Sequence, residues 1–418
     1  MAASTDFLCH NNSTASSDNL FLRTSLISCY TLNNRTCEER PHMNIDIIAV
    51  KTRSDLMKFI KLPWKIYKGN KCWVPPLIRD MLETLGPGKE TAGSKISREM
   101  FLAFSDGEPA ARIFAGIDAN LNEKKNIKLG YFSLFECINS PLVAEELFKK
   151  ALSWFRERGV ESIIGPVSAT GTDGDEYKGL LIDCFDRPPV IMNSYNPPYY
   201  RKLLEDCGFE KDYDVFAYYL DMGMHFKKDM SKAIEFAQKK YNFRVDTLNL
   251  KEMDREIRDL KHVMDLAVPD EWPDLVAPSL EEVREMADKL TPYADPDFIA
   301  IARSGAEAVG FILSLPDLNQ VLIHMNGRIT PISALKYLWY KRRMKSARAF
   351  VMFVVPAFRS KGVSYAIYHK AFQNALRKGY EWGEASTIGE TNVRMRSDIE
   401  SFGGKHYKTY RIFKRSVE

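Results

Sequence analysis

The sequence carries one pattern of apolar and turn residues twice, and this repeat constrains the fold more than any other feature. Residues 101–117 contain two apolar runs on either side of Asp106-Gly107, and residues 298–313 contain two on either side of Ser304-Gly305. Apolar runs of strand length around a polar turn with glycine predict a β-hairpin. We therefore expect one hairpin at the start of each repeat.

Each hairpin is followed by the same series of elements. In the first half, the strand at 131–135 leads to Ser140-Pro141, a pair that suits a helix N-terminus. In the second half, the strand at 349–355 leads to apolar residues at helical spacing over 363–376, which end at Gly379. The shared order of hairpin, strand, helix, strand, helix and final strand predicts two copies of one α+β unit.

The length of the chain agrees with two domains. A chain of 418 residues is too long for one compact core, and its 45% hydrophobic and 27% charged residues are ordinary for a globular protein. Residues 1–42 are rich in Ser, Thr and Asn, and we expect a disordered extension there. The predicted domains are 43–220 and 221–418.

Charge, cysteines and hydropathy favour a cytoplasmic protein. The net charge of +4 is too small for the dense basic face of a nucleic-acid binder. Seven cysteines without paired close spacing indicate reduced thiols rather than a disulfide framework or a metal site. No stretch approaches the roughly 20 apolar residues that cross a bilayer. The oligomeric state stays open.

The two copies differ at the turn between the central strand and its helix. In the second copy, Arg359, Lys361 and Gly362 precede the helix, where backbone N–H groups and the helix dipole favour an anion such as a pyrophosphate. The alternative is a helix cap with solvated Arg359 and Lys361. The first copy has Glu136 and no glycine at this place, and its charge would repel phosphate. The sequence therefore predicts the phosphate site in the second copy.

This turn resembles the Gln/Arg-x-x-Gly-x-Gly/Ala motif of the GNAT acyltransferase superfamily, with Ser364 in place of the last small residue. More closely, nearly everything after Met43 resembles the bacterial ceramide synthase-like family of GNAT proteins. The motifs that carry the resemblance are Pro63-Trp64, residues 73–77 (WVPPL), Gly165-Pro166, residues 179–181 (GLL), Pro188-Pro189, residues 195–200 (YNPPYY), residues 315–320 (LPDLNQ), Gly327-Arg328, Glu384-x-Ser386, Glu390-x-Asn392 and residues 408–412 (KTYRI).

The resemblance implies two tandem GNAT-like domains, each with a mixed, mostly antiparallel sheet flanked by helices. It also implies an acyl-CoA co-substrate, direct N-acylation of an amine, and a long-chain amino alcohol as the acceptor. Acylation of a small amine or amino acid, and a non-catalytic acyl-CoA sensor, are the alternatives. The residues expected to contact acyl-CoA are Val354, Val355, Arg359, Ser360, Lys361, Gly362, Val363, Ser364 and Asn392.

Direct transfer needs a base, because an alkyl ammonium titrates near 10 and must lose a proton. Glu384 and Glu390 flank the strand end beside the phosphate turn, and an extended chain would put Glu384 and Ser386 on one face. A helix-capping role is the alternative for both glutamates and for Asn392. Tyr410 is the candidate proton donor for the leaving thiolate, and a strand N–H at Val354 or Val355 is the candidate oxyanion donor.

Other bases and nucleophiles are disfavoured. His324 lies beside an apolar run, where a lone histidine is more often a packing residue than a base. No triad with Ser or Cys is evident, so neither Cys137 nor Cys184 is expected to act as a nucleophile.

The predicted acceptor site includes an unusual run of tyrosines. Asn196 and the prolines after it suit a helix start, but the tyrosines around them are unexplained by that role. We therefore expect a cleft between the domains, lined by Tyr195, Asn196, Tyr199, Tyr200, Glu176 and Asn319. Glu176 lies in the 168–178 loop, which departs from the family pattern and so leaves the acceptor open.

The segment from Ser333 to Lys345 mixes aromatic and basic side chains on a predicted helix. Such a helix can lie on an anionic membrane surface, which would suit a lipid acceptor. The alternative is a solvated helix whose aromatic side chains pack inward.

Overall fold

The computed structural model describes residues 44–86, 96–170, 176–223, 230–268, 276–291 and 293–418. The extension predicted over residues 1–42 lies outside this range. Residues 43–418 form one unit, and everything below concerns that unit.

The elements follow the predicted order in both halves. The first half contains β1 (Ile45–Ala49), α1 (Arg53–Ile66), α2 (Ile78–Leu85), β2 (Ile96–Ser105), β3 (Glu108–Asp118), α3 (Ala119–Lys125), β4 (Leu129–Cys137), α4 (Pro141–Arg156), β5 (Ser162–Gly165), β6 (Leu180–Leu181), α5 (Tyr200–Asp206) and β7 (Glu210–Asp221). The second half contains α6 (Ser231–Tyr241), β8 (Arg244–Thr247), α7 (Met253–Ala267), α8 (Leu280–Leu290), β9 (Ile299–Ser304), β10 (Glu307–Pro316), α9 (Asn319–Leu322), α10 (Pro331–Lys341), β11 (Ser346–Val354), α11 (Val363–Arg377), β12 (Trp382–Gly389), α12 (Val393–Ser401) and β13 (Lys405–Ser416).

The repeat predicted from the sequence is confirmed. Both hairpins form, and their turns use backbone with positive φ: 82° at Gly107 and 62° at Gly305. These values suit glycine because it lacks a Cβ atom. The predicted N-cap also forms, since the Ser140 side chain accepts a hydrogen bond from Val143 N at the start of α4.

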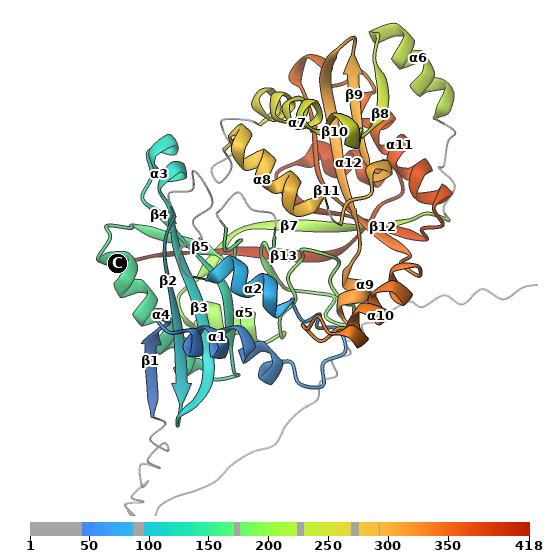
Figure 1. The fold of residues 1–418 in the computed structure, drawn as a ribbon. Helices are drawn as coiled ribbons and strands as arrows, with labels where there is room; N and C mark the ends of the chain where they lie inside the picture. Colours follow the sequence, from blue (N-terminus) through green and yellow to red (C-terminus); the bar gives the residue numbers. More distant parts are fainter. Residues whose placement is uncertain (1–43, 87–95, 171–175, 224–229, 269–275, 292) are drawn as a thin grey trace, which may run out of the picture. The chain divides into compact units, whose positions relative to one another are not determined.

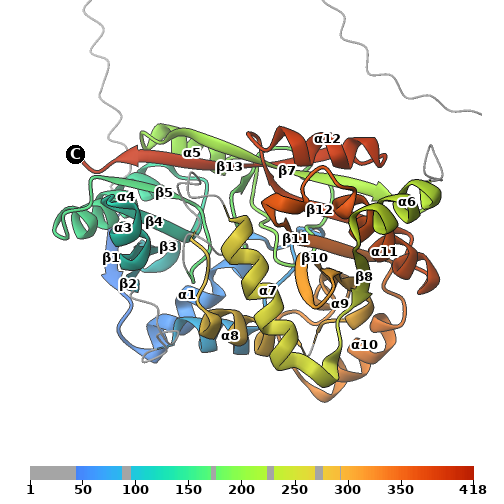
Figure 2. The same cartoon turned by 90° about the horizontal axis from the view of Figure 1, so that it is seen from above.

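All strands join one sheet, in the order β1-β2-β3-β4-β5-β13-β7-β12-β11-β10-β9-β8, with β6 paired to β13 (Figure 1). Among the strands that the structure describes, only β4–β5 and β11–β12 pair in parallel, so the sheet is mixed and mostly antiparallel, as predicted. The view from above shows β13 and β7 running along the length of the unit and linking the two halves (Figure 2).

The last strand of each half lies beside the other half. β13 pairs with β5 of the first half, and β7 pairs with β12 of the second half. β13 and β7 also pair with each other. The sheet thus crosses the boundary predicted at residue 221, and the division into two domains at that residue stays a prediction.

Helices cover the sheet and enclose separate cores. In the first half, α4 and α5 share a core with β2 and β3, whereas α1 and α2 pack in another core with Leu102 and Phe114. In the second half, α7 and α11 both pack against β10. Ile412 and Phe413 of β13 belong to the two cores of the first half, so the C-terminal strand is part of that interior.

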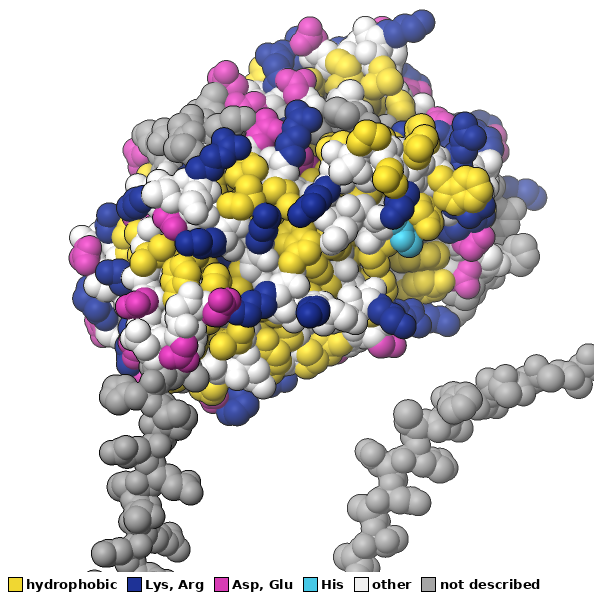
Figure 3. Space-filling model, turned by 60° about the horizontal axis from the view of Figure 1, so that its bottom comes forward, with side chains coloured by type: hydrophobic (Ala, Val, Ile, Leu, Met, Phe, Trp, Pro, Cys, Tyr) yellow, Lys and Arg dark blue, Asp and Glu magenta, His cyan; other side chains and the backbone are white. Residues whose placement is uncertain are grey.

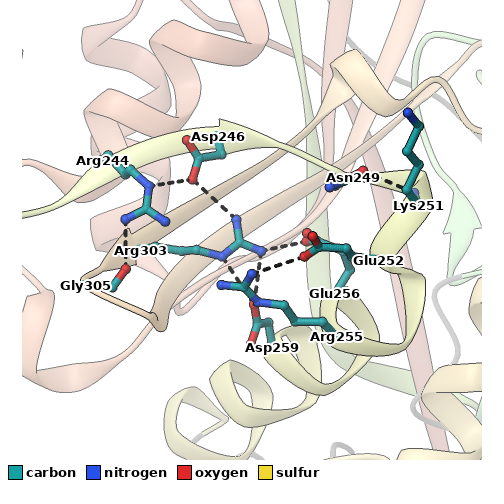
Figure 4. Close-up of polar contacts among 10 residues, drawn as sticks. All are labelled: Arg244, Asp246, Asn249, Lys251, Glu252, Arg255, Glu256, Asp259, Arg303 and Gly305. Carbon is teal, nitrogen blue, oxygen red and sulfur yellow. Dashed lines mark hydrogen bonds and ion pairs between the residues drawn. The ribbon is translucent and has the colours of Figure 1, made fainter.

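A buried arginine ties α7 to the edge of the second half. The Arg303 guanidinium on β9 contacts Glu256 at 2.7 Å and Asp259 at 3.0 Å, both on α7, and Asp246 on β8 at 3.6 Å (Figure 4). Arg303 and Glu256 are each 3% exposed. The charged pair is therefore fully enclosed, and its contacts fix the packing of α7 on the sheet.

Residues 317–345 form an insertion between β10 and β11 that carries α9 and α10. A small core that includes Leu318 and Val321 holds it together, and Leu77 and Ile191 of the first half pack against this core. No helix in the described ranges is long and apolar enough to cross a membrane. Among the same residues, no group of three or more His, Cys, Asp or Glu side chains could hold a metal ion.

Candidate functional site

The parallel strands β11 and β12 lie side by side over only part of their length. Their pairing runs from Ser346 with Trp382 to Ala349 with Ala385. Beyond these residues β11 stays paired with β10, and β12 stays paired with β7. We call the place where they part the strand split. It leaves one edge of β11 without a strand partner among the described residues.

The register of β11 shows which backbone groups face the strand split. Val355 N donates to Val309 O at 3.0 Å, and Val354 lies opposite Gly310. Antiparallel neighbours alternate between hydrogen-bonded and non-hydrogen-bonded pairs, so Val354 and Met352 direct their N–H and C=O groups toward the split. Of the two valines predicted as oxyanion donors, Val355 has its N–H engaged in the sheet and Val354 has its N–H directed at the split.

The turn after β11 has the form that the sequence indicates. Gly362 has a φ of 80°, and a Cβ atom there would come within 3.0 Å of the Ala237 side chain, so both backbone and space favour glycine. No side chain caps the start of α11, which begins at Val363. Backbone N–H groups at an uncapped helix start attract anions.

The basic side chains of this turn have different surroundings. Arg359 donates to Val354 O at 3.1 Å and to Ala267 O at 3.0 Å, so its guanidinium joins the turn to the end of α7. Lys361 lies over the rings of Phe358 and Tyr241. Arg394 of α12 donates to Ser360 Oγ at 2.8 Å and is a third cation beside the turn, one that sequence reasoning missed.

Glu384 lies at the closed end of the strand split. Its side chain is 0% exposed, and Ser386 Oγ donates to its Oε1 at 2.6 Å, as the alternation along a strand predicts. Asn193 Nδ2 donates to the same oxygen at 2.5 Å, and the Tyr407 hydroxyl donates to Oε2. The carboxylate is therefore held by three neutral donors from three separate segments.

A buried arginine contacts the hydrogen-bonded group around Glu384. Arg348, on β11 directly beside Glu384 in the register, is 0% exposed and donates from Nε to Ser386 Oγ at 3.0 Å. It also donates to Ile191 O at 3.0 Å. A chain of hydrogen bonds thus runs from the guanidinium through the serine hydroxyl to the carboxylate, and it orients both groups.

A second buried carboxyl lies nearby. Asp317 accepts from Ile191 N at 2.9 Å and from Ser346 Oγ at 3.0 Å. Burial raises its pKa to about 6, and the charge of Glu384 adds to the rise in the pKa. Asp317 connects the insertion to the 188–196 segment, which also supplies Asn193.

Three side chains of β13 complete the cluster. Burial, followed by the nearby Glu384 charge, raises the pKa of both Tyr407 and Tyr410. The Tyr410 side chain is fully buried, and its hydroxyl has no hydrogen-bond partner among the described residues. Lys408 donates to Pro188 O at 2.7 Å, and burial lowers its pKa. Tyr410, predicted from sequence, and Tyr407, not predicted, both lie close to Glu384.

The structure separates the two glutamates that the sequence grouped. Glu390 forms a half-buried ion pair with Lys211 at 2.7 Å. It is six residues from Glu384, about 20 Å in an extended strand. Asn392 accepts from Met395 N at 3.2 Å and so caps α12. Only Glu384 belongs to the buried cluster.

The tyrosine run mostly has partners inside the first half. Tyr199 donates to Cys137 O at 2.8 Å, and the fully buried Tyr200 donates to Glu136 Oε2 at 2.7 Å. The Asn196 amide bonds both backbone groups of Leu181.

The other predicted acceptor residues are spread over several segments. Tyr195 donates to Phe185 O at 2.8 Å and is partly exposed. Asn319 donates to Pro189 O at 2.9 Å, which brings it to the segment that carries Asn193. Glu176 is half-buried and adjoins residues 171–175, which lie outside the described range. His324, the alternative base, is exposed and stacks on Tyr340 with ring centroids 3.8 Å apart.

The first half fills the equivalent of the phosphate turn with its own side chains. Glu136 lies 3.6 Å from the guanidinium of Arg112, which is 3% exposed and donates to Phe59 O at 2.7 Å. Burial raises the pKa of Glu136, and the Arg112 charge opposes that rise in pKa. This half therefore has an internal ion pair where the second half has an open turn.

An apolar pocket adjoins the strand split, with about 800 Å³ of space free of atoms, including its open mouth. Ala349 and Ala385, the last paired residues of β11 and β12, line it. The other small residues of its wall are Ser314, Ala347, Ala371, Ala375 and Gly383, and the aromatic ones are Phe298, Tyr368, Phe372 and Phe402.

Sequence reasoning missed several members of the cluster. They are Asn193, Asp317, Arg348, Tyr407 and Lys408, together with Arg394 at the turn. A signal existed for Arg348, since a charged residue between Ala347 and Ala349 interrupts an apolar strand pattern. A charge in such a place is buried with partners, and buried charges gather at functional sites.

The chain is similar to two curated proteins over most of its length. It is 28% identical to the bacterial ceramide synthase of Caulobacter vibrioides, over 90% of this chain and 98% of that protein. It is 27% identical to protein YghO of Escherichia coli, over 87% of this chain and 94% of that protein. No family model matches the chain.

Solved structures agree on the fold. A tandem GNAT protein from the clavulanic acid biosynthesis pathway aligns with a TM-score of 0.54 and 9% identity, over 90% of this chain and 99% of that one. A GCN5-related N-acetyltransferase from Sphaerobacter thermophilus aligns with a TM-score of 0.50 and 12% identity, over 90% and 96%. The fold is therefore that of tandem GNAT proteins, and the chain is similar over most of its length to a bacterial ceramide synthase.

Proposed function

We propose that this chain is an N-acyltransferase that moves an acyl group from a CoA thioester to the amine of a long-chain amino alcohol. The observation that carries the proposal is the strand split, which has an anion-favouring turn at its open end and the buried Glu384 at its closed end. The acceptor class follows from the likeness to the Caulobacter ceramide synthase, because a ceramide is the amide of a long-chain amino alcohol.

The donor end of the site suits the CoA part of the thioester. The uncapped start of α11, with Lys361 and Arg394 beside it, would hold the pyrophosphate. The edge of β11 offers alternate N–H and C=O groups, which an amide-containing arm can pair with as an added strand does. Arg359 would shape this turn rather than contact phosphate, because its guanidinium already bonds two backbone carbonyls.

Glu384 is the base that the geometry favours. In the reaction one ammonium proton passes to a carboxylate, the amine nitrogen then bonds to the thioester carbon, and the carbon–sulfur bond breaks as the nitrogen loses its second proton, which balances the proton that the thiolate takes up. The three neutral donors on Glu384 fix its orientation, and Arg348 anchors the serine among them. Glu390 is less suited because Lys211 already neutralises it at the surface.

The remaining charges can also be handled by residues near the split. The Val354 N–H, directed at the split, would stabilise the oxyanion. The Tyr410 hydroxyl, which has no partner among the described residues, can give its proton to the departing thiolate. We assign the acyl chain to the apolar pocket, because the pocket begins at the paired residues where the strand split closes.

The test incubates the purified chain with CoA thioesters of several chain lengths and a panel of amines that includes long-chain amino alcohols. Free thiol and amide are followed together by mass spectrometry. Amide should form with the long-chain acceptors, and Glu384→Gln should lower kcat/KM by about 100-fold or more, the usual size of a lost general base.

Glu390→Gln is the matched control, since it removes a carboxylate from the turn directly after the same strand, outside the buried cluster. It should keep activity within a few fold. A larger loss in Glu390→Gln than in Glu384→Gln would transfer the role of base to Glu390. Amide with small amines alone would reject the long-chain acceptor, and thioester binding without any amide would reject the reaction.

A further inference from the structure

Helix α10 presents a continuous apolar face to solvent. Ile332, Leu335, Leu338 and Trp339 are 70%, 69%, 61% and 58% exposed, and the adjoining Ile329 is 57% exposed. At 100° per residue, the four helix positions fall on one side of α10. Monomeric soluble proteins rarely leave so many large apolar side chains together at the surface, and such patches mark interaction sites.

The inward face of α10 already packs against the small core of the insertion, so the exposed apolar side chains are not the ones that bind the helix to the rest of the molecule. Tyr337 and Tyr340 pack against the small core of the insertion, and Tyr340 stacks on His324. Ser333 is buried and completes a capping box with Thr330 at the helix start. The inner face of the helix is therefore packed, whereas none of the four side chains on its outer apolar face belongs to a hydrophobic core of the described residues.

The charges around this face have one sign. Residues 328–345 contain six basic residues and no acidic one. The basic residues Arg328, Lys336, Lys341, Arg342, Arg343 and Lys345 are all exposed. In Figure 3 hydrophobic side chains gather on this side of the molecule among Lys and Arg, and acidic side chains lie mostly toward its edges.

We propose that α10 and its flanks dock on an anionic lipid bilayer, with Leu335, Leu338 and Trp339 in the interface and the basic residues among the headgroups. A helix with an apolar face, flanking cations and an interfacial tryptophan has the composition of a surface-lying membrane helix. The Arg343 guanidinium over the Trp339 ring, at 3.9 Å from the centroid, keeps a cation at the border of the apolar face. A protein partner would need acidic groups around an apolar groove, whereas a bilayer of anionic lipids supplies both features on any approach.

The docked surface lies on the insertion that also covers the buried cluster. Asp317 and Asn319, at the start of the insertion, bond the 188–196 segment beside Glu384. Docking would thus bring this segment to the bilayer in which a long-chain amine dissolves. That link rests on the proposed function, whereas the docking itself does not.

The experiment measures co-sedimentation of the full chain with vesicles, without any substrate. One set of vesicles contains phosphatidylcholine alone, and the other contains phosphatidylcholine with phosphatidylglycerol. The chain should bind the anionic vesicles and lose binding in high salt. Binding should fall by about tenfold or more in Leu335→Ser/Leu338→Ser/Trp339→Ser and in Lys341→Glu/Arg342→Glu.

Phe236→Ser is the matched control, because Phe236 is 64% exposed on α6, outside the α10 surface. It should bind as the natural chain does, and circular dichroism should show that all variants stay folded. Equal binding of the natural chain and the α10 variants would overturn the proposal, as would no binding to anionic vesicles. Light scattering that shows a dimer, dissociated by the α10 substitutions, would reassign the face to a second copy of the chain. Because no substrate is present, none of these results depends on the acyltransferase reaction.

Discussion

At the scale of single residues, the site depends on charged groups that are enclosed rather than exposed. Glu384 and Arg348 are both 0% exposed, and each is satisfied by hydrogen bonds to neighbours far away in the sequence. Enclosed charges are costly unless they are paired and bonded. The same side chains at the surface would be solvated and would have no fixed orientation.

The burial of Asp317 makes the free energy of unfolding depend on pH. Its pKa is about 6 in the folded chain, against about 4 for an aspartate in an unfolded chain. Between these values the native state keeps a proton that the unfolded state has lost, so the free energy of unfolding falls as the pH rises from about 4 to about 6. The fall should amount to about 3 kcal/mol for this group. For Asp317→Asn, the free energy of urea unfolding at pH 4 minus that at pH 7 should be smaller than in the natural chain by that amount.

The control is Asp288→Asn, which alters an exposed aspartate of α8. If the stability of Asp317→Asn instead fell more between the two pH values than that of the natural chain, Asp317 would ionise more easily in the folded chain than in the unfolded one.

At the scale of elements, helices are held to the sheet by a few buried contacts as well as by apolar packing. α7 packs on β10 and is also tied to β9 by Arg303. Its last turn bonds the phosphate turn through Ala267 O and Arg359. The position of the turn at the strand split therefore depends on where α7 lies.

Arg303→Ala should destabilise the chain by about 3 kcal/mol, because it leaves Glu256 buried without its cation. Arg244→Ala is the control. Arg244 is an exposed arginine of the same cluster, paired with Asp246 at 2.9 Å, and its loss should cost less than about 1 kcal/mol. Urea unfolding followed by circular dichroism measures both variants. Equal losses in the two variants would show that the enclosure of Arg303 adds nothing.

At the scale of the whole molecule, the exchange of last strands makes each half depend on the other. β13 lies between β5 and β7, and its Ile412 and Phe413 are buried in the cores of the first half. The first half of the sequence thus lacks one strand of its own sheet. Each copy of the repeat thus has the full order of elements in its sequence, but neither copy forms a complete sheet and core without the other.

Residues 44–221 expressed alone should therefore fail to unfold cooperatively and should be digested rapidly by proteases. The missing strand leaves the facing edges of β5 and β7 without hydrogen-bond partners and leaves two cores open. The same fragment with residues 404–418 joined through a flexible linker should recover a cooperative transition in urea. A cooperative transition in the fragment without that strand would contradict the interdependence of the halves.

The local sequence pattern was sufficient to predict the secondary-structure elements and part of the site. The sequence by itself determined the repeat, both hairpins, the glycine turn before α11 and the pairing of Glu384 with Ser386. Each of these depends on residues a few positions apart, where periodicity and backbone preference act directly.

Only the tertiary structure decided which segments meet. Asn193 contacts Glu384 across 191 positions of the chain. Arg359, which the sequence predicts as a phosphate contact, instead donates to the carbonyl of Ala267 in α7. The exchanged strands show the same limit, because the edge of a strand offers the same N–H and C=O groups to either neighbour. Strand pattern thus fixes which side chains face the core, whereas the choice of partner depends on how both halves pack together.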